Sequence, residues 1–398
     1  MLKPVGMIAL LFCVAASAVA QTADELNKQG MQALANGDLP KAIEDFKKAI
    51  ATDSTYVKAY VNLGYIYYSN GLMDEAIGLY GKAIQIDPPN AMAHNNLGAT
   101  YLALGKHNEA ILEYKLAIKS YPDYAEAHNN LAFAYYSLGL YERAIGEAEK
   151  ALELKPDYAM AYNYLGISHH ALGNYDEAEA RFRKALEIKP DFIVAINNLG
   201  TTKRFKGQIE ESIQTYLQAV KIDSTNIDTY NGLGLAYLTK GDVQNAIVKF
   251  EKVLTIAPHD PISHNNLAFS YFEQMNYAMA MQHAKAAERY GLKINADLIA
   301  DLEKSLDPTY LRARQIVVKS AAEAQDILKL LQSGDRFPEI AAKKSIDAAT
   351  SRKGGDFGFF KKGDLNAEIE TVILNLKIGD ISAVLKTAAG YHIFQRLN

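Results

Sequence analysis

The sequence predicts a multidomain chain in which an all-α superhelical solenoid of helix-turn-helix repeats precedes a small α+β domain. Two observations support this prediction. Small residues, glycines and prolines recur every 34 residues from Ala23 to Ile294 without an insertion, and a fixed period of roughly 20–50 residues is typical of stacked repeats. After Asp307-Pro308 the period stops, and short β-branched runs bounded by glycine replace it, which indicates a separate domain.

The composition excludes several classes of function. A net charge of −4 over 398 residues does not favour a nucleic-acid partner, because such proteins carry a basic surface. Cys13 is the only cysteine of the sequence. It lies within the first twenty residues, which we expect to be removed as a signal peptide, so thiol catalysis and cysteine metal sites are not expected in the mature chain. No pattern predicts a metal ion or a cofactor.

The first twenty residues have the layout of a secretory signal peptide. Lys3 is followed by an uncharged apolar run. The small residues Ala18 and Ala20 stand three residues and one residue before the expected cleavage site, where a signal peptidase requires small side chains. The run is shorter than the ~20 residues that a membrane-spanning helix needs. We expect cleavage after Ala20 and a periplasmic or otherwise exported protein without a membrane span; an uncleaved anchor is the alternative.

Each recurring position of the period has a structural role, as the third unit illustrates. Gly98 lets two helices approach closely, and Gly105 ends the first helix in a left-handed cap. Ala110 is a second close-packing site, and Pro122 stops the second helix. The predicted repeat domain covers residues 21–294 and has eight units: 23–56, 57–90, 91–124, 125–158, 159–192, 193–226, 227–260 and 261–294.

The eighth unit departs from this pattern, because Met275 replaces the turn glycine. Residues 295–310 then read as a capping helix and a linker. A terminal repeat should be atypical, since its outer face is not covered by another repeat.

The 34-residue pattern resembles the tetratricopeptide repeat. The resemblance implies a superhelix whose first helices line a groove, and asparagines recur at the positions that would face it. Carboxamides both donate and accept hydrogen bonds, so they could pair with the backbone of an extended peptide; alternatively they brace neighbouring helices. The candidate groove residues are Asn62, Asn96, Asn130, Asn163, Asn198, Asn231 and Asn266.

Residues 311–398 read as a small α+β domain. The segment "RQIVVKS" is β-branched and alternating, which predicts a strand. Two amphipathic helices are expected next. The first covers "AAEAQDILKLLQSG" and ends at Gly334, and the second covers "RFPEIAAKKS". Phe357 to Phe360 form a glycine-bounded strand, "AEIETVILNLKIGD" a helix, and the final segment two strands joined at Gly390.

The pieces "RQIVVK", "FPEIAAKKSID", "GGDFGFFKKGDL", "IETVILNLKIGDIS" and "TAAGYHIFQRL" resemble the parvulin family of peptidyl-prolyl cis-trans isomerases in order and spacing. This resemblance implies an apolar seat for a prolyl ring and a polar cluster beside it. Gln315 stands where the family usually has a second histidine. The implied substrate-binding residues are Phe357, Phe360, Leu365 and Ile369, and the implied catalytic residues are Gln315, Asp347, Thr387 and His392.

Isomerisation of an X-Pro bond needs no nucleophile, because the obstacle is a torsional barrier of about 20 kcal/mol. The resemblance therefore predicts an exported folding or assembly factor that binds extended, proline-containing polypeptides in the repeats and isomerises them in the C-terminal domain. The alternative is a cell-envelope scaffold with a degenerate isomerase domain used only for binding, and Gln315 favours it. No Ser-His-Asp or metal-spaced cluster supports a hydrolase.

Overall fold

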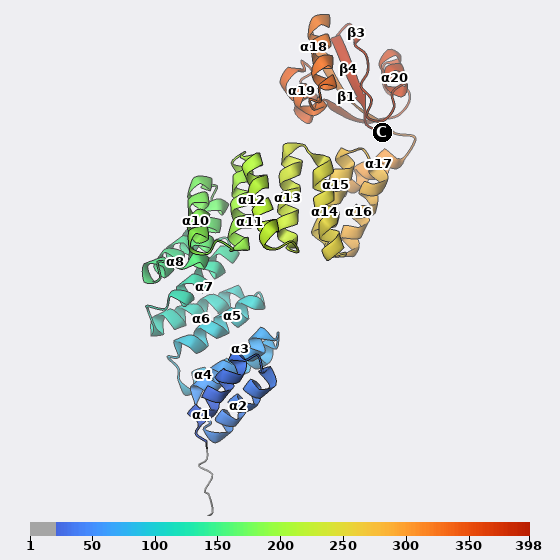
Figure 1. The fold of residues 1–398 in the computed structure, drawn as a ribbon. Coiled ribbons are helices and arrows are strands. Elements are labelled where there is room, and N and C mark those ends of the chain that lie inside the picture. The colour runs from blue at the N-terminus through green and yellow to red at the C-terminus, as the bar shows by residue number, and fades with distance from the viewer. Residues whose placement is uncertain (1–20) are drawn as a thin grey trace, which may run out of the picture. The chain divides into compact units, whose positions relative to one another are not determined.

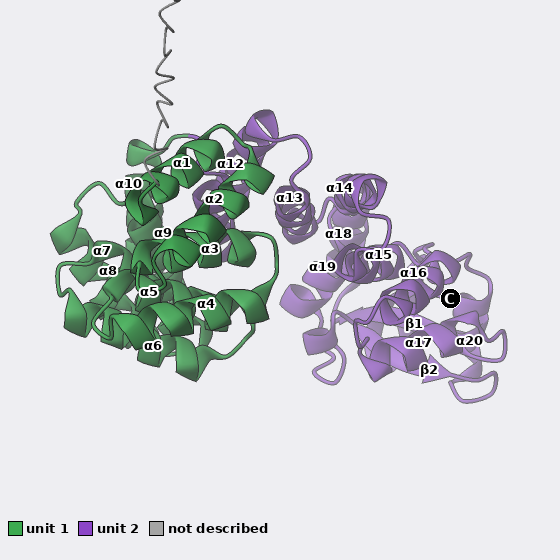
Figure 2. Ribbon diagram, turned by 90° about the horizontal axis from the view of Figure 1, so that it is seen from below, with its two compact units in different colours: residues 1–190 green, residues 191–398 purple. Residues whose placement is uncertain are grey.

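The computed structural model describes residues 21–398 (Figure 1). The predicted signal peptide and its cleavage site after Ala20 therefore lie outside the described residues. The chain divides into two compact units, residues 1–190 and 191–398 (Figure 2). Each unit is described by itself.

The first unit consists of antiparallel helix pairs, each pair matching one 34-residue period. The second helix of a pair ends two residues before the proline where the repeat has one, as at Ile86 before Pro88 and Ser120 before Pro122. Its helices are α1 (Ala23–Ala35), α2 (Leu39–Thr52), α3 (Val57–Ser69), α4 (Met73–Ile86), α5 (Ala91–Ala103), α6 (His107–Ser120), α7 (Ala125–Ser137), α8 (Tyr141–Leu154), α9 (Ala159–Ala171) and α10 (Tyr175–Ile188).

The predicted left-handed turns are present. The glycines that follow the first helix of each of the first seven pairs have φ values between 72° and 85°, a region that residues with a Cβ rarely adopt. In the eighth pair Met275 has a φ of 59°. The same backbone turn is therefore kept in the eighth repeat without the residue that adopts it most easily.

A glycine and an aromatic ring fix the distance between the two helices of most pairs. A Cβ placed on Gly98 would lie 2.8 Å from the ring of Tyr114, and the equivalent distances in five other pairs are 2.4–2.9 Å. In the fourth pair both positions hold alanine, Ala132 and Ala148, and both are fully buried. Each repeat thus uses one of two packing solutions, glycine against an aromatic ring or alanine against alanine.

The second unit begins with three more helix pairs and a single helix. Ile294, Leu298 and Leu302 are buried against the eighth pair, so the single helix α17 covers an apolar face that would otherwise be open to water. These helices are α11 (Ile193–Phe205), α12 (Ile209–Ile222), α13 (Ile227–Lys240), α14 (Val243–Ile256), α15 (Pro261–Glu273), α16 (Tyr277–Arg289) and α17 (Ala296–Leu306).

The unit ends in a four-stranded antiparallel sheet with the strand order β2-β1-β4-β3. This confirms the predicted fold class, a helical solenoid followed by a small α+β domain. Its elements are β1 (Leu311–Val318), α18 (Ala321–Gln332), α19 (Phe337–Lys344), a 3-10 turn (Ser351–Lys353), β2 (Asp356–Phe360), α20 (Ala367–Leu374), β3 (Leu385–Thr387) and β4 (Gly390–Arg396).

The two faces of this sheet have different partners (Figure 1). Ile316, Val318 and Ile393 pack against α18 and α19. On the opposite face, Ala313 and Phe394 belong to a cluster that includes residues of α20. Because side chains alternate along a strand, Gln315 and His392 lie on the face shared with α20.

Candidate active site

Four of the residues implied by the sequence resemblance form one hydrogen-bonded network. Gln315 Nε2 donates to Asp347 Oδ2 at 2.8 Å, and Gln315 Oε1 lies 3.2 Å from His392 Nδ1. Thr387 Oγ lies 2.8 Å from His392 Nε2. Three separate strands and the loop after α19 therefore bring Gln315, Asp347, Thr387 and His392 together.

The carboxamide of Gln315 fixes the tautomer of His392. The amide group of Gln315 donates to Asp347, so its oxygen faces His392 and can only accept. His392 Nδ1 must therefore carry a proton, and the neutral ring leaves Nε2 as an acceptor for the Thr387 hydroxyl. The Thr387 oxygen in turn accepts from the Ala389 N–H at 3.1 Å. A neutral imidazole therefore allows each of these hydrogen bonds to have one donor and one acceptor.

The pKa shifts fit this arrangement. Burial lowers the pKa of His392 below its ordinary value of 6.5, while the charge of Asp347 opposes the shift. For Asp347, burial works to raise the pKa, but hydrogen bonds from Thr350, Ala349 and Gln315 outweigh it and lower the pKa. At neutral pH the network therefore holds one carboxylate and one uncharged imidazole.

The four residues expected to seat a prolyl ring lie in a single apolar cluster. Phe360 is buried, and Phe357, Leu365 and Ile369 are partly buried against the same core. The rings of Phe357 and Phe360 have centroids 5.6 Å apart, and the ring of His392 stacks with Phe394 of this cluster at 5.7 Å. The polar network and the apolar cluster are therefore neighbours, as binding of a prolyl ring beside catalytic polar groups would require. That the cluster binds substrate and the network is catalytic stays a prediction.

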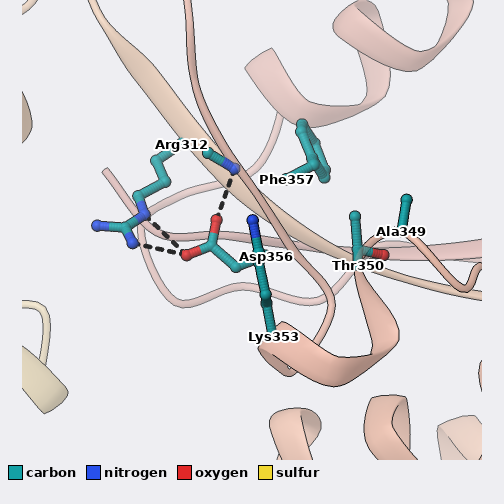
Figure 3. A pocket seen from close by; sticks show the side chains of 7 residues that line it. Arg312, Ala349, Thr350, Lys353, Asp356 and Phe357 are labelled. Carbon is teal, nitrogen blue, oxygen red and sulfur yellow. Dashed lines mark hydrogen bonds and ion pairs between the residues drawn. The ribbon is translucent and has the colours of Figure 1, made fainter.

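A cavity of about 560 Å³ lies beside Phe357 (Figure 3). Arg312 and Asp356 form an ion pair in its lining, with Nη2 2.7 Å from Oδ2. Thr350 and Lys353 line the same cavity.

The sequence interpretation missed two parts of this site. Thr350 Oγ donates to Asp347 Oδ2 at 2.5 Å, and a threonine three residues after an aspartate is a sequence signal for such a turn. The Arg312–Asp356 pair joins residues 44 apart in the sequence. Only the pairing of β1 with β2 brings these two side chains together, so local sequence gave no signal for it.

The asparagines of the repeats make hydrogen bonds between consecutive first helices. Asn62 Nδ2 donates to Asn27 at 2.9 Å, and Asn130 Nδ2 donates to Asn95 at 3.0 Å. Asn231 accepts a hydrogen bond from a serine of the next repeat, and Asn163 is buried. These contacts support the bracing role that was the alternative, and binding of peptide by the candidate set stays a prediction.

Within residues 21–398, no three side chains of His, Cys, Asp or Glu lie close enough to share a metal ion. No helix in this part of the chain is long and apolar enough to cross a bilayer.

The fold and site together define a repeat protein that ends in an isomerase-type domain. Residues 312–398 match the family of the PPIC-type PPIase domain, that is, the peptidyl-prolyl isomerase domain. Tetratricopeptide-repeat families match residues 33–71, 65–105, 100–139, 123–191, 204–241 and 227–260. The chain therefore belongs to the tetratricopeptide-repeat proteins that carry a C-terminal PPIC-type isomerase domain.

Two curated relatives each match about a fifth of this chain. The chain is 42% identical over 85 residues to the foldase protein PrsA of Caldanaerobacter subterraneus, covering 21% of this chain and 28% of that protein. It is 40% identical over 85 residues to foldase protein PrsA 2 of Bacillus anthracis, covering 21% and 30%. The chain thus spans less than a third of the length of these relatives.

The solved structure of a tetratricopeptide repeat protein from Parabacteroides merdae resembles the helical part. The TM-score is 0.52 at 21% identity, and the match covers 62% of this chain and 98% of that one. At this identity the likeness establishes the fold of the repeats alone.

Proposed function

We propose that the protein is an exported folding factor that catalyses cis-trans isomerisation of X-Pro bonds in its C-terminal domain and binds extended polypeptide in its repeats. The observation that carries the proposal is the adjacency of an apolar cluster and a polar network in which Asp347 is ionised and His392 is neutral. The foldase names of the relatives and the PPIC-type domain support the same class of activity.

The proposed catalysis moves no proton and forms no covalent bond. Phe357, Phe360, Leu365 and Ile369 would hold the prolyl ring, while the acyl part of the X-Pro bond rotates. In the twisted state the amide loses resonance, so its carbonyl and nitrogen change their charge distribution. Fixed dipoles and the Asp347 carboxylate beside the bond would favour that state over the planar one.

Export is the part of the proposal that rests on residues 1–20 alone. The signal-like pattern predicts a mature chain that begins at Gln21 and lies in the periplasm or an equivalent compartment. Mass spectrometry of the purified envelope protein checks this terminus. A membrane-bound protein that retains Met1 would contradict it.

The scaffold alternative has one specific observation in its favour. Gln315 cannot titrate, although it occupies the place at which the resembling family usually has histidine. The structure shows that its carboxamide both donates and accepts within the network. A neutral histidine can also donate once and accept once, so Gln315→His should leave activity equal or higher if the enzyme proposal is correct.

Ile369→Asp tests the prolyl seat. A carboxylate in the apolar cluster would face the ring and leave a charge without a partner, which is costly. We expect kcat/KM on an X-Pro tetrapeptide to fall at least tenfold, measured by a protease-coupled assay on the full chain. Ile378→Asp is the matched control, because Ile378 is exposed at 53% in the same domain, and it should keep wild-type activity.

The outcomes separate the two functions. If the wild-type chain does not isomerise any of several X-Pro peptides above background, the enzyme proposal fails. Activity that appears only with Gln315→His would favour the scaffold. An active and folded Ile369→Asp protein would show that the prolyl seat lies elsewhere, even if the enzyme proposal stands.

A further inference from the structure

The eighth repeat differs from the other seven at its turn, where it meets the C-terminal domain. Met275 has a φ of 59° where the other repeats have glycine, a conformation that a Cβ makes unfavourable. Its side chain lines a cavity of about 280 Å³ together with Phe337 and Gln395 of the C-terminal domain. Its sulfur lies 4.0 Å from where a Cβ on Gly379 would be. The unfavourable turn therefore places a side chain against the isomerase domain.

A second contact joins α16 to the end of β4. The hydroxyl of Tyr277 donates to the backbone oxygen of Leu397 at 2.6 Å, and both residues are buried. The N–H of Leu397 donates to the backbone oxygen of Arg312 at 2.9 Å. Buried tyrosine hydroxyls are usually hydrogen-bonded, and here the acceptor belongs to the other domain.

The third contact runs through the guanidinium of Arg312. Its Nη1 lies 3.0 Å from Asp301 of α17, and its Nε and Nη2 lie 2.9 and 2.7 Å from Asp356 of β2. The Arg312 and Asp356 side chains are only 15% and 14% exposed. The Arg312–Asp356 bonds, which lie within the isomerase domain, are therefore stronger than a surface ion pair; Asp301, the partner on α17, is 37% exposed.

Asp356 carries this contact into the candidate active site. Its second oxygen, Oδ1, accepts from the N–H of Gly358 at 2.8 Å. The bond fixes the backbone on both sides of Phe357, which belongs to the proposed prolyl seat and lines the cavity beside Arg312 (Figure 3). A continuous chain of bonds thus runs from Asp301 of the cap helix to the strand that holds Phe357.

We propose that the eighth repeat and α17 are a docking surface for the isomerase domain, and that Arg312 is a positioning residue that holds the prolyl seat through this surface. The docking stands on the contacts alone, whereas the effect on the seat rests on the proposed function. The eighth repeat then ends the solenoid and supports the catalytic domain, which explains why Met275, Tyr277 and Asp301 meet that domain.

The test uses the full chain with Tyr277→Phe, Asp301→Asn and the double variant. Tyr271→Phe and Asp326→Asn are the matched controls, because Tyr271 bonds Glu251 and Asp326 bonds Lys329 at exposed sites. Each test substitution removes one hydrogen bond or one charge and keeps the shape of the side chain. Hydrogen exchange followed by mass spectrometry reports how often the C-terminal sheet opens.

We expect amide exchange in β1 and β2 to become about two- to tenfold faster in each single variant, the range expected for one lost hydrogen bond, and faster again in the double variant. The controls should exchange like the wild type. Unchanged exchange in the double variant would overturn the docking proposal. This readout does not depend on catalysis, so it remains decisive if the chain has no isomerase activity.

The positioning role is tested by kinetics on an X-Pro tetrapeptide. The double variant should have a higher KM with a smaller change in kcat, because a displaced Phe357 would bind the prolyl ring less tightly. Faster exchange with wild-type kcat and KM would overturn the positioning role of Arg312. A wild-type chain without activity is instead a failure of the proposed function.

Discussion

At the scale of single residues, the candidate site depends on which atoms carry protons. His392 is 5% exposed and has a partner on each ring nitrogen. Burial lowers its pKa and so favours the neutral ring, and the direction of the Gln315 carboxamide places the proton of that ring on Nδ1. Protonation would put an N–H on Nε2. The Thr387 hydroxyl could then no longer donate its hydrogen to Nε2 and would have to rotate.

This arrangement predicts how the stability of the fold depends on pH. Because the pKa of His392 is below 6.5, the folded protein keeps a neutral ring at and above pH 6.5, while the unfolded chain already begins to bind a proton there. The contribution of this residue to stability is therefore complete above about pH 6.5 and is lost as the pH falls toward the lowered pKa.

We expect kcat/KM to be constant above about pH 6.5 and to fall below it by about tenfold per pH unit once the folded pKa is passed. The measurement is a pH profile of the full chain and of His392→Gln, which lacks the titrating ring and should not show this acid limb. An identical acid limb in His392→Gln would assign the titration to another group.

At the scale of elements, the sequence predicted the helix pairs better than the site. The turn glycines, the prolines and the small residues of each repeat act locally, so their period alone was enough to predict the helices. The bonds of Thr350 and Arg312 depend on how the loop after α19 and strands β1 and β2 come together. Such contacts join residues that are far apart in the chain, and only the folded sheet reveals them.

The glycine and aromatic pair of the third repeat gives an element-scale prediction. Gly98→Ala should destabilise α5 and α6 by about 1–3 kcal/mol, because the new Cβ would lie 2.8 Å from the buried ring of Tyr114. With Tyr114→Ala already present, the clash with the ring is gone, the Ala110 backbone oxygen at 3.2 Å is the close contact that remains, and the helix preference of alanine dominates. The same change should then stabilise the protein by about 1 kcal/mol.

The measurement is urea unfolding of the wild type, the two single variants and the double variant. The double variant has alanine at both positions, as the fourth repeat has with Ala132 and Ala148. Gly81→Ala is the control, because no atom lies within 4 Å of its added Cβ, and it should stabilise both backgrounds equally. A Gly98→Ala effect of the same sign in both backgrounds would refute the packing argument.

At the scale of the whole molecule, the proposed function puts two binding sites in one chain. If the repeats hold an extended client, any proline of that client within reach of the isomerase domain is present at a raised effective concentration. A tetrapeptide whose proline is bound in the isomerase domain has few residues left with which to bind the repeats. The combination of repeats and isomerase domain therefore predicts a higher kcat/KM for long substrates than for short ones, a difference that neither part would produce alone.

We expect kcat/KM for X-Pro isomerisation in a long unfolded polypeptide to exceed that for the same X-Pro sequence in a tetrapeptide. Replacing Asn96, Asn130 and Asn198 by alanine should reduce the value for the long substrate and leave the tetrapeptide value unchanged. Each hydrogen bond lost to the client should cost about 0.5–1.5 kcal/mol, so the combined loss should be tenfold or more. Asn108→Ala, on the exposed surface of α6, is the control.

Asn130 also braces Asn95 of the preceding repeat, so the helical signal and the thermal unfolding of the triple variant must be compared with the wild type. A variant that is folded and loses only the long-substrate advantage places client binding in the repeats. If both substrates react alike in the wild type, the repeats do not deliver clients to the isomerase domain. If the folded triple variant keeps the full advantage, these asparagines only brace the helices and the client is held elsewhere.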